Sequence, residues 1–215
     1  NDAVACSING SGYIGTGDIG SGSTKDFWEY DPNTDAWTQK TDFPTNISEA
    51  VGFSINGKGY VGTGGNYSKE FWEYDPITNI WTQKADFPEI GRRFAIGFSI
   101  SGKGYVGTGL DNSDDGRNDF WEYDPVTNTW SQKTNVPGGS RYAAVGFSMN
   151  GKGYIGLGTD KFSSKKDNFY EYNPTTNSWS SIADFPVSYR IGATGFSING
   201  KGYIAFGESF SFSVE

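Results

Sequence analysis

Short runs of apolar residues in this chain alternate with small and polar residues. In residues 51–55, VGFSI, an apolar side chain stands at every second position, which is the period of a β-strand. The pair Asn56-Gly57 follows, and it suits the two positive-φ positions of a type I′ hairpin turn. Residues 60–64, YVGTG, predict the returning strand, with glycines on one face that allow another backbone to come close.

A second hairpin follows the first. Residues 71–74, FWEY, favour a strand, residues 75–79, DPITN, favour a turn, and residues 81–84, WTQK, run back. The four strands form one antiparallel unit, which ends at an Asp-Phe-Pro segment or its Asn-Val-Pro variant. No stretch has helical periodicity, so the pattern predicts an all-β chain. The ending segment stands at 42–44, 86–88, 135–137 and 184–186.

The same unit recurs along the chain. Its first phrase, FSINGKGYVGTG from Phe53, returns in close copies, and a diverged version begins at Cys6. A period of roughly 45–50 residues is typical of a solenoid or a propeller, in which each unit is stable only against its neighbours. We expect a single domain over residues 1–215. Its units span about 3–44, 50–88, 94–137 and 143–186, with a partial unit at 193–215.

Several residues recur at fixed places within the unit. They are seen as Gly64-Gly65 after the second strand, Tyr74-Asp75-Pro76 in the third and Trp81 in the fourth. With these residues the units resemble kelch repeats over essentially the whole chain. The resemblance implies a β-propeller of four-stranded antiparallel blades, with about four and a half blades here. An arginine also follows the blade-ending proline, as Arg92, Arg141 and Arg190.

The chain departs from the kelch pattern in three respects. The glycine pair is complete only in the second copy, and Ile47 stands where the other linkers carry arginine. The number of full blades is also small for a closed ring, and an open array exposes sheet edges that invite association. Three interpretations follow: a piece of a longer chain, an irregular fifth blade, or copies that assemble. We favour the first and the third.

Composition narrows the function classes. The formal net charge is −8, whereas a nucleic-acid-binding protein needs a basic stripe, so we expect no nucleic-acid partner. No run of 18 apolar residues is present to span a membrane. The single cysteine, Cys6, takes a strand position that Phe fills in other copies, so we expect a buried, inert thiol. The acidic, Gly- and Ser-rich composition fits a secreted or cell-surface protein.

The chain contains no histidine, which removes Ser-His-Asp catalysis and histidine-ligated zinc. The repeated carboxylates are poor catalytic candidates, because a catalytic pair needs two different environments. A residue present in every unit is explained more simply by blade architecture. We therefore predict no catalytic residue. These repeated acids are Glu29, Glu73, Glu122 and Glu171, with Asp31, Asp75 and Asp124.

The linker arginines are the leading candidates for binding. Arg92, Arg141 and Arg190 lie in loops that lead to the innermost strand of the next unit, so we expect them to converge at one mouth of the channel. Convergent guanidinium groups bind carboxylates or phosphates, and the kelch resemblance implies that this rim binds acidic peptides or other ligands. In the alternative interpretation, each arginine braces a loop or pairs with a neighbouring Asp. The variable residues beside them complete the candidate site: Arg93, Tyr142 and Tyr189.

The loop between the second and third strands also varies. In the third unit it spaces Asp111, Ser113, Asp115 and Asp119 as in D-x-S-x-D-G-x-x-D calcium loops. Such loops place alternate oxygens round a turn that glycine permits. The loop therefore suggests a Ca²⁺ site, and its alternative is a solvated acidic turn. No other cofactor is expected.

The sequence thus predicts a non-enzymatic binding or scaffold module that presents variable loops to a protein, an acidic peptide or a glycan. Self-assembly through the incomplete blade is a related possibility. The alternative is a carbohydrate-active enzyme, a sugar isomerase or lyase. It would use Arg141 with Tyr142, Tyr189 or Glu49 in the channel. Fold alone does not decide between these functions.

Overall fold

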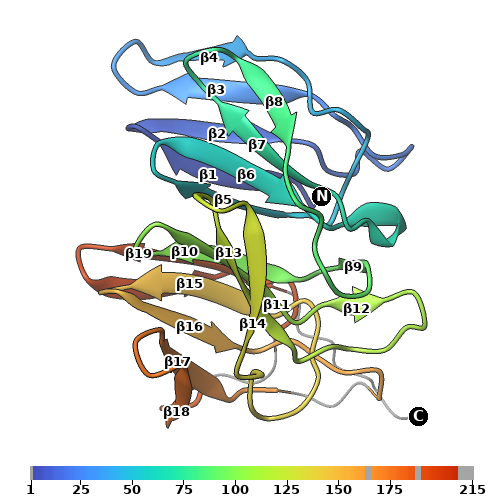
Figure 1. Ribbon diagram of the computed structural model, residues 1–215, viewed down its shortest axis with the longest axis vertical. Coiled ribbons are helices and arrows are strands. Elements are labelled where there is room, and N and C mark those ends of the chain that lie inside the picture. The colour runs from blue at the N-terminus through green and yellow to red at the C-terminus, as the bar shows by residue number, and fades with distance from the viewer. Residues whose placement is uncertain (1, 163–165, 187–189, 208–215) are drawn as a thin grey trace.

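The computed structural model describes residues 2–162, 166–186 and 190–207. The chain forms four four-stranded antiparallel sheets in a propeller arrangement, followed by a two-stranded sheet (Figure 1). The prediction of an all-β fold with four-stranded blades is therefore confirmed. Within each sheet the strands follow chain order, as expected for consecutive hairpins. We call the sheets blades 1 to 4 and the two-stranded sheet the half-blade.

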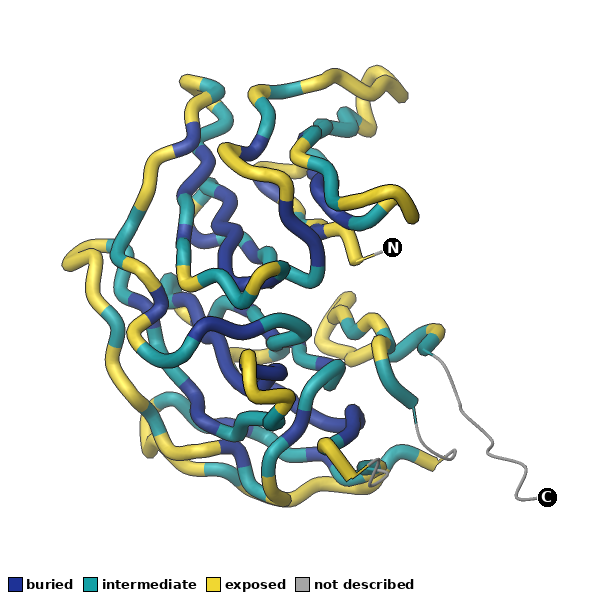
Figure 2. The backbone as a smooth tube through the Cα atoms, turned by 90° about the vertical axis from the view of Figure 1, so that its right-hand side faces the viewer, coloured by how far each residue is buried: buried dark blue, intermediate teal, exposed yellow. Residues whose placement is uncertain are grey.

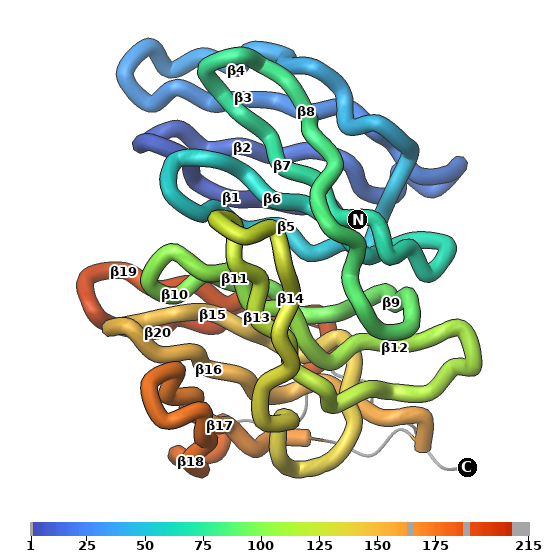
Figure 3. Tube along the Cα trace, in the orientation of Figure 1, coloured from blue at the N-terminus to red at the C-terminus, as the bar shows by residue number. Residues whose placement is uncertain are grey.

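The strands have the following bounds. Blade 1 consists of β1 (Val4–Ile8), β2 (Ser11–Gly15), β3 (Phe27–Asp31) and β4 (Ala36–Gln39). Blade 2 consists of β5 (Val51–Ile55), β6 (Lys58–Gly62), β7 (Phe71–Asp75) and β8 (Ile80–Gln83), with a short 3-10 turn, η1 (Gly65–Tyr67). Blade 3 consists of β10 (Ile96–Ile100), β11 (Lys103–Gly107), β13 (Phe120–Asp124) and β14 (Thr129–Lys133). Blade 4 consists of β15 (Val145–Met149), β16 (Lys152–Gly156), β17 (Phe169–Asn173) and β18 (Ser178–Ile182). The half-blade consists of β19 (Thr194–Ile198) and β20 (Lys201–Ala205), while β9 (Arg92–Arg93) pairs with β12 (Leu110–Asp111) outside the blades (Figure 3).

The inner hairpin has the predicted geometry. Asn56 and Gly57 have φ values of 49° and 80°, as a type I′ turn requires. In this register Phe53 lies opposite Tyr60, and the same pairing recurs in the later blades and the half-blade. The turn therefore fixes which side chains share a face of each blade.

The blades stand side by side round a central channel. The first strand of each unit contacts the first strand of the next, in the order β1, β5, β10, β15 and β19. Figure 2 shows the resulting arc, with the N-terminus at one end. The innermost strands thus line the channel, and the loops that enter them gather at one mouth.

The hydrophobic core lies between blades. Each blade has a trailing face, which meets the next blade, and a leading face, which meets the preceding one. At the first interface the rings of Tyr13 and Tyr74 are 5.8 Å apart, and those of Phe27 and Trp81 are 5.0 Å apart. The trailing face of blade 1 contributes Val4, Ile8, Tyr13, Phe27 and Phe43, and the leading face of blade 2 contributes Val61, Tyr74 and Trp81.

Glycine on the leading face permits this close packing. A Cβ on Gly104 would lie 2.7 Å from the ring of Phe53 in the preceding blade. The Phe98 ring packs in the same way on Gly153, where a Cβ would also lie 2.7 Å away. The glycines of the repeated phrase therefore let one blade's aromatic ring rest on the backbone of the next.

The outer hairpins also join neighbouring blades. The Trp81 indole donates a hydrogen bond of 3.0 Å to the carbonyl of Thr41, in the linker after blade 1. The amide of Thr41 in turn donates to Asn79 Oδ1 at 2.9 Å. Trp130 and Trp179 repeat the indole contact to the linkers before them. The T-N-x-W phrase thus binds each blade to its predecessor.

Candidate functional site at the channel mouth

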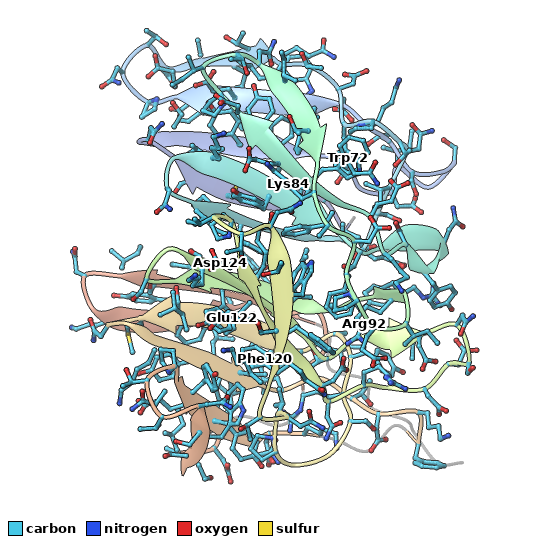
Figure 4. The ribbon with its side chains drawn as sticks, in the orientation of Figure 1. Trp72, Lys84, Arg92, Phe120, Glu122 and Asp124 are labelled. Atoms are coloured by element: carbon cyan, nitrogen blue, oxygen red, sulfur yellow. The ribbon has the colours of Figure 1, made fainter. Side chains whose placement is uncertain are left out.

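Arg92 is fully buried and serves as an internal brace (Figure 4). Its guanidinium donates two hydrogen bonds of 2.8 Å to the carboxylate of Asp119, just before β13 of blade 3. It also donates to the carbonyl of Thr108 at 3.0 Å. This arrangement matches the interpretation in which an arginine pairs with a neighbouring Asp.

Arg141 occupies the equivalent place before blade 4, and it is also fully buried. Its guanidinium donates to Asn168 Oδ1 at 3.0 Å and to the carbonyl of Pro137 at 3.1 Å. Burial lowers the pKa of Arg141, because no carboxylate takes the place that Asp119 has beside Arg92. Arg92 and Arg141 therefore do not line the channel mouth, which corrects the prediction of convergent, accessible guanidinium groups there.

The remaining predicted residues have different surroundings. Arg190 donates to the carbonyl of Gly207 at 3.2 Å. Arg93 is one-third exposed, lies 3.5 Å from a Glu49 carboxylate oxygen and stacks over the Tyr67 ring. Tyr142 lines the channel mouth. Tyr189 lies outside the described residues.

The mouth itself is built by five equivalent residues, which we call the mouth ring. Each stands two residues before the innermost strand of its unit and has a positive φ, from 49° to 63°. After the first of them, the amide of each donates to the carbonyl of its predecessor, over distances of 3.0–3.1 Å. An open series of backbone hydrogen bonds therefore runs across the described units, and the name mouth ring refers to its curved course. Its members are Asp2, Glu49, Phe94, Ala143 and Gly192.

The mouth ring lines an open cavity of about 750 Å³. The residue after each ring member is always alanine, and these alanines also line the cavity. The ring position itself differs in every unit, as Asp, Glu, Phe, Ala or Gly. Because the backbone is the same and the side chains differ, the cavity wall is asymmetric. Sequence reasoning named only Glu49 among these five residues, for the enzymatic alternative, although comparing the residue before the invariant alanine across the five copies reveals the whole set.

Acidic and aromatic groups dominate the polar chemistry of the cavity. Asp2 and Glu49 are the charged residues among its described lining, and Phe94 and Tyr142 supply aromatic rings. Burial raises the pKa of Glu49, and the negative charges of Asp2 and Asp18 raise it further, while Arg93 opposes them. The cavity is thus suited to a ligand without negative charge.

The repeated carboxylates serve the blades. Glu73 on β7 accepts a hydrogen bond of 2.5 Å from the Tyr60 hydroxyl on the adjacent strand, and Lys84 lies 3.2 Å away. Figure 4 labels Lys84 and also Glu122, which is the equivalent of Glu73 in blade 3. Burial tends to raise the pKa of Glu73, but its hydrogen bonds to Tyr60 and the lysines bring the net pKa below the usual value. The same Tyr–Glu contact recurs at Glu29, Glu122 and Glu171.

The predicted calcium loop is organised by internal contacts. Asp111 accepts hydrogen bonds from the amides of Ser113 and Asp115 and from the Arg117 guanidinium. The Asp115 carboxylate pairs with Lys161, and Asp119 is bound by Arg92. Among the residues that the structure describes, no group of three or more His, Cys, Asp or Glu side chains could hold a metal ion. The loop carboxylates are therefore held by different partners, and calcium binding would require the loop to rearrange.

Cys6 is partly buried against the first interblade core. Burial raises the pKa of its thiol to about 12, which keeps it protonated and unreactive near neutral pH. The described residues include no helix long and apolar enough to span a membrane.

Fold and geometry together define the class of this protein, a β-propeller. The solved structure titled "Structure of YjhT" has the same fold, with a TM-score of 0.82 and 19% sequence identity over 96% of this chain and 72% of that chain. At that identity the likeness concerns the fold alone. No protein-family model and no curated protein matches the sequence.

Proposed function

We propose that this chain is a non-enzymatic binding module whose recognition surface is the mouth ring, and that its ligand is a neutral glycan. One observation carries the proposal: a single ring position bears five different residues on an otherwise repeated backbone, round a cavity of about 750 Å³. Variable residues on a rigid scaffold are a common basis of recognition. A concave site with a few polar groups and aromatic walls is typical of small-ligand binding.

The charges of the cavity favour a glycan over an acidic peptide. Arg92 and Arg141 are buried and engaged inside the protein, so they cannot neutralise an acidic ligand. The carboxylates of Asp2 and Glu49 would repel such a ligand, whereas they can accept hydrogen bonds from sugar hydroxyls. Phe94 and Tyr142 offer apolar ring surface for the C–H faces of a sugar. A sugar ligand also fits the secreted or surface location expected from composition.

A glycan microarray, followed by calorimetry with the best-bound neutral oligosaccharide, tests this proposal. Glu49→Gln and Phe94→Ala should each weaken binding at least about ten-fold, which is roughly 1.4 kcal/mol. Ile77→Ser is the control, because Ile77 is 90% exposed on an outer turn and does not line the cavity. Absence of neutral-glycan binding, or unchanged affinity in both mouth-ring variants, would refute the proposal. Selective binding of acidic peptides would do the same.

The enzymatic alternative retains one supporting observation. Glu49 has a raised pKa inside a cavity, and such a group is a candidate general acid. Arg141 is unavailable to it, because the guanidinium is buried against Asn168. Mass spectrometry of the bound oligosaccharide after long incubation separates the two functions. A product formed by the wild type and lost in Glu49→Gln would replace the binding module with a carbohydrate-active enzyme.

A further inference from the structure

The half-blade exposes a trailing face that is buried in the full blades. Phe196 is 42% exposed, whereas its equivalents Phe53 and Phe98 are each 5% exposed. Tyr203 is 43% exposed, against 2% for Tyr60. Ile198 follows the same pattern at 52%. The described residues of the chain therefore leave an interblade surface without its neighbour.

Blade 1 exposes the complementary leading face. Ile14 is 41% exposed and Trp37 is 55% exposed, whereas the equivalent Val61 and Trp81 are 1% and 9% exposed. Gly12 is the counterpart of the glycines that receive an aromatic ring. A Cβ placed on it would meet only its own blade's Tyr30, at 3.9 Å. The ring-binding surface is thus present and open.

We infer that the half-blade of one copy docks on the leading face of blade 1 of a second copy, so that the chain associates head to tail. The argument rests on continuity with the interblade interface, which recurs within the chain. A phenylalanine ring packs on a glycine of the next blade at every such interface in the described chain except the first, where Cys6 takes the place of the phenylalanine. The half-blade presents the inner-hairpin part of a trailing face, and blade 1 presents a leading face, which are the two kinds of surface that meet at that interface. The Phe196 ring of one copy packs on the Gly12 backbone of the next copy. Because different surfaces meet, the contact is heterologous and leads to chains of copies or to a ring.

One residue makes this contact looser than the internal ones. Ala5 stands where later blades have glycine. At Gly97, for example, an added Cβ would lie 2.9 Å from the Val51 Cβ of the preceding blade. The Ala5 methyl group therefore holds an incoming blade away from the inner strand. The association is weak and depends on protein concentration.

Sedimentation equilibrium of the 215-residue chain measures this association directly. The weight-average mass should rise above the 23.4 kDa of a single chain over a roughly hundred-fold concentration range. Ala5→Gly should lower the concentration of half-association roughly ten-fold, because it removes the obstructing methyl group. A mass that stays at one chain throughout overturns the inference and means that the faces are covered within the molecule.

Paired variants identify the surfaces. Phe196→Ser removes the inserted ring. Gly12→Val fills the receiving site, and its Cβ would meet only Tyr30 of its own blade, at an ordinary contact distance of 3.9 Å. Each variant alone should be monomeric. Mixed together, they should form a one-to-one dimer and nothing larger, because each retains one intact face. Wild-type association in Gly12→Val, or no dimer in the mixture, contradicts the assignment. Gly12→Val keeps the test valid if Phe196→Ser disturbs the half-blade, and Ile77→Ser serves as the exposed apolar control.

Discussion

The guanidinium of Arg92 holds both carboxylate oxygens of Asp119 at 2.8 Å, across the boundary between the blade 2 linker and blade 3. At the equivalent boundary before blade 4, the Arg141 guanidinium donates to the neutral side chain of Asn168. The same repeat position thus holds an arginine–carboxylate pair before blade 3 and a buried arginine with only neutral hydrogen-bond acceptors before blade 4. This difference allows the contribution of the brace to be measured within a single molecule.

Asp119→Asn should lower the free energy of unfolding by about 3 kcal/mol at pH 7, because it leaves the Arg92 cation buried without its partner. Urea denaturation measures the change. Ser131→Ala, an exposed strand substitution in the same blade, should stay within about 0.5 kcal/mol of wild type. A loss of similar size in both variants would mean that the pair has no special role.

The same pair predicts an acid dependence. Burial tends to raise the pKa of Asp119, but the hydrogen bonds and charge of Arg92 outweigh it and hold the pKa below the usual value. Because the folded pKa is depressed, the stabilisation is complete above the unfolded value of about 3.9 and is lost as pH falls through the folded value. Wild type and Asp119→Asn should therefore converge in stability at strongly acidic pH. A constant difference down to pH values of about 2 would contradict this explanation.

Asn168→Asp should stabilise the protein by about 1–2 kcal/mol, because it gives the buried Arg141 cation the carboxylate that Arg92 already has. The shift in urea midpoint measures the effect. Asn150→Asp adds the same charge at an exposed turn and serves as the matched control, with little change expected. Destabilisation by Asn168→Asp would show that Arg141 is bound well enough by neutral acceptors.

The buried tyrosines predict a loss of stability in alkali. Burial is the main cause that raises the pKa values of Tyr60 and Tyr105, with a further increase from their hydrogen bonds to glutamates. Burial also raises the pKa of Tyr154 to about 12. The folded state keeps protons that the unfolded chain releases above about pH 10, so stability falls above that pH. Absorbance at the tyrosinate band should rise together with unfolding. Ionisation well before unfolding would contradict the burial of these hydroxyl groups.

Calcium should leave the melting temperature unchanged relative to chelator, since Asp119 is held by Arg92 and Asp115 by Lys161. An ion that binds only the native state must raise the stability of that state. Calorimetric melting in excess calcium and in excess chelator is the measurement. A saturable increase that disappears in Asp111→Asn would establish the calcium site and show that the loop rearranges to form it.

Much of the fold could be predicted from local pattern. Period-2 alternation and the Asn56-Gly57 turn predict the inner hairpin, and repetition extends one unit to the whole chain. The environment of Arg92 could not be read in this way, because its partner Asp119 lies 27 residues further on, in the next blade. Stacking of the blades, rather than local sequence, decides whether a linker side chain faces the channel or the core.

The sequence and the structure direct attention to the same rim through different residues, and whether this rim binds a ligand stays a prediction. Tyr142 lines the mouth as expected, whereas the guanidinium groups of Arg92 and Arg141 turn into the protein. Glu49 and Phe94 carry little signal as isolated residues. They gain significance only because the fold places them at equivalent points of one hydrogen-bonded ring.

Backbone amide shifts on addition of the best-bound neutral oligosaccharide test the central claim most directly, because they locate the ligand on the propeller. We expect the largest shifts at Glu49, Phe94 and Ala143, whose amides belong to the mouth ring. They should be clearly smaller in Glu49→Gln at the same sub-saturating ligand concentration. Shifts confined to the loops at 18–25 and 110–118, with the mouth ring unaffected, would contradict the claim that this ring is the recognition surface.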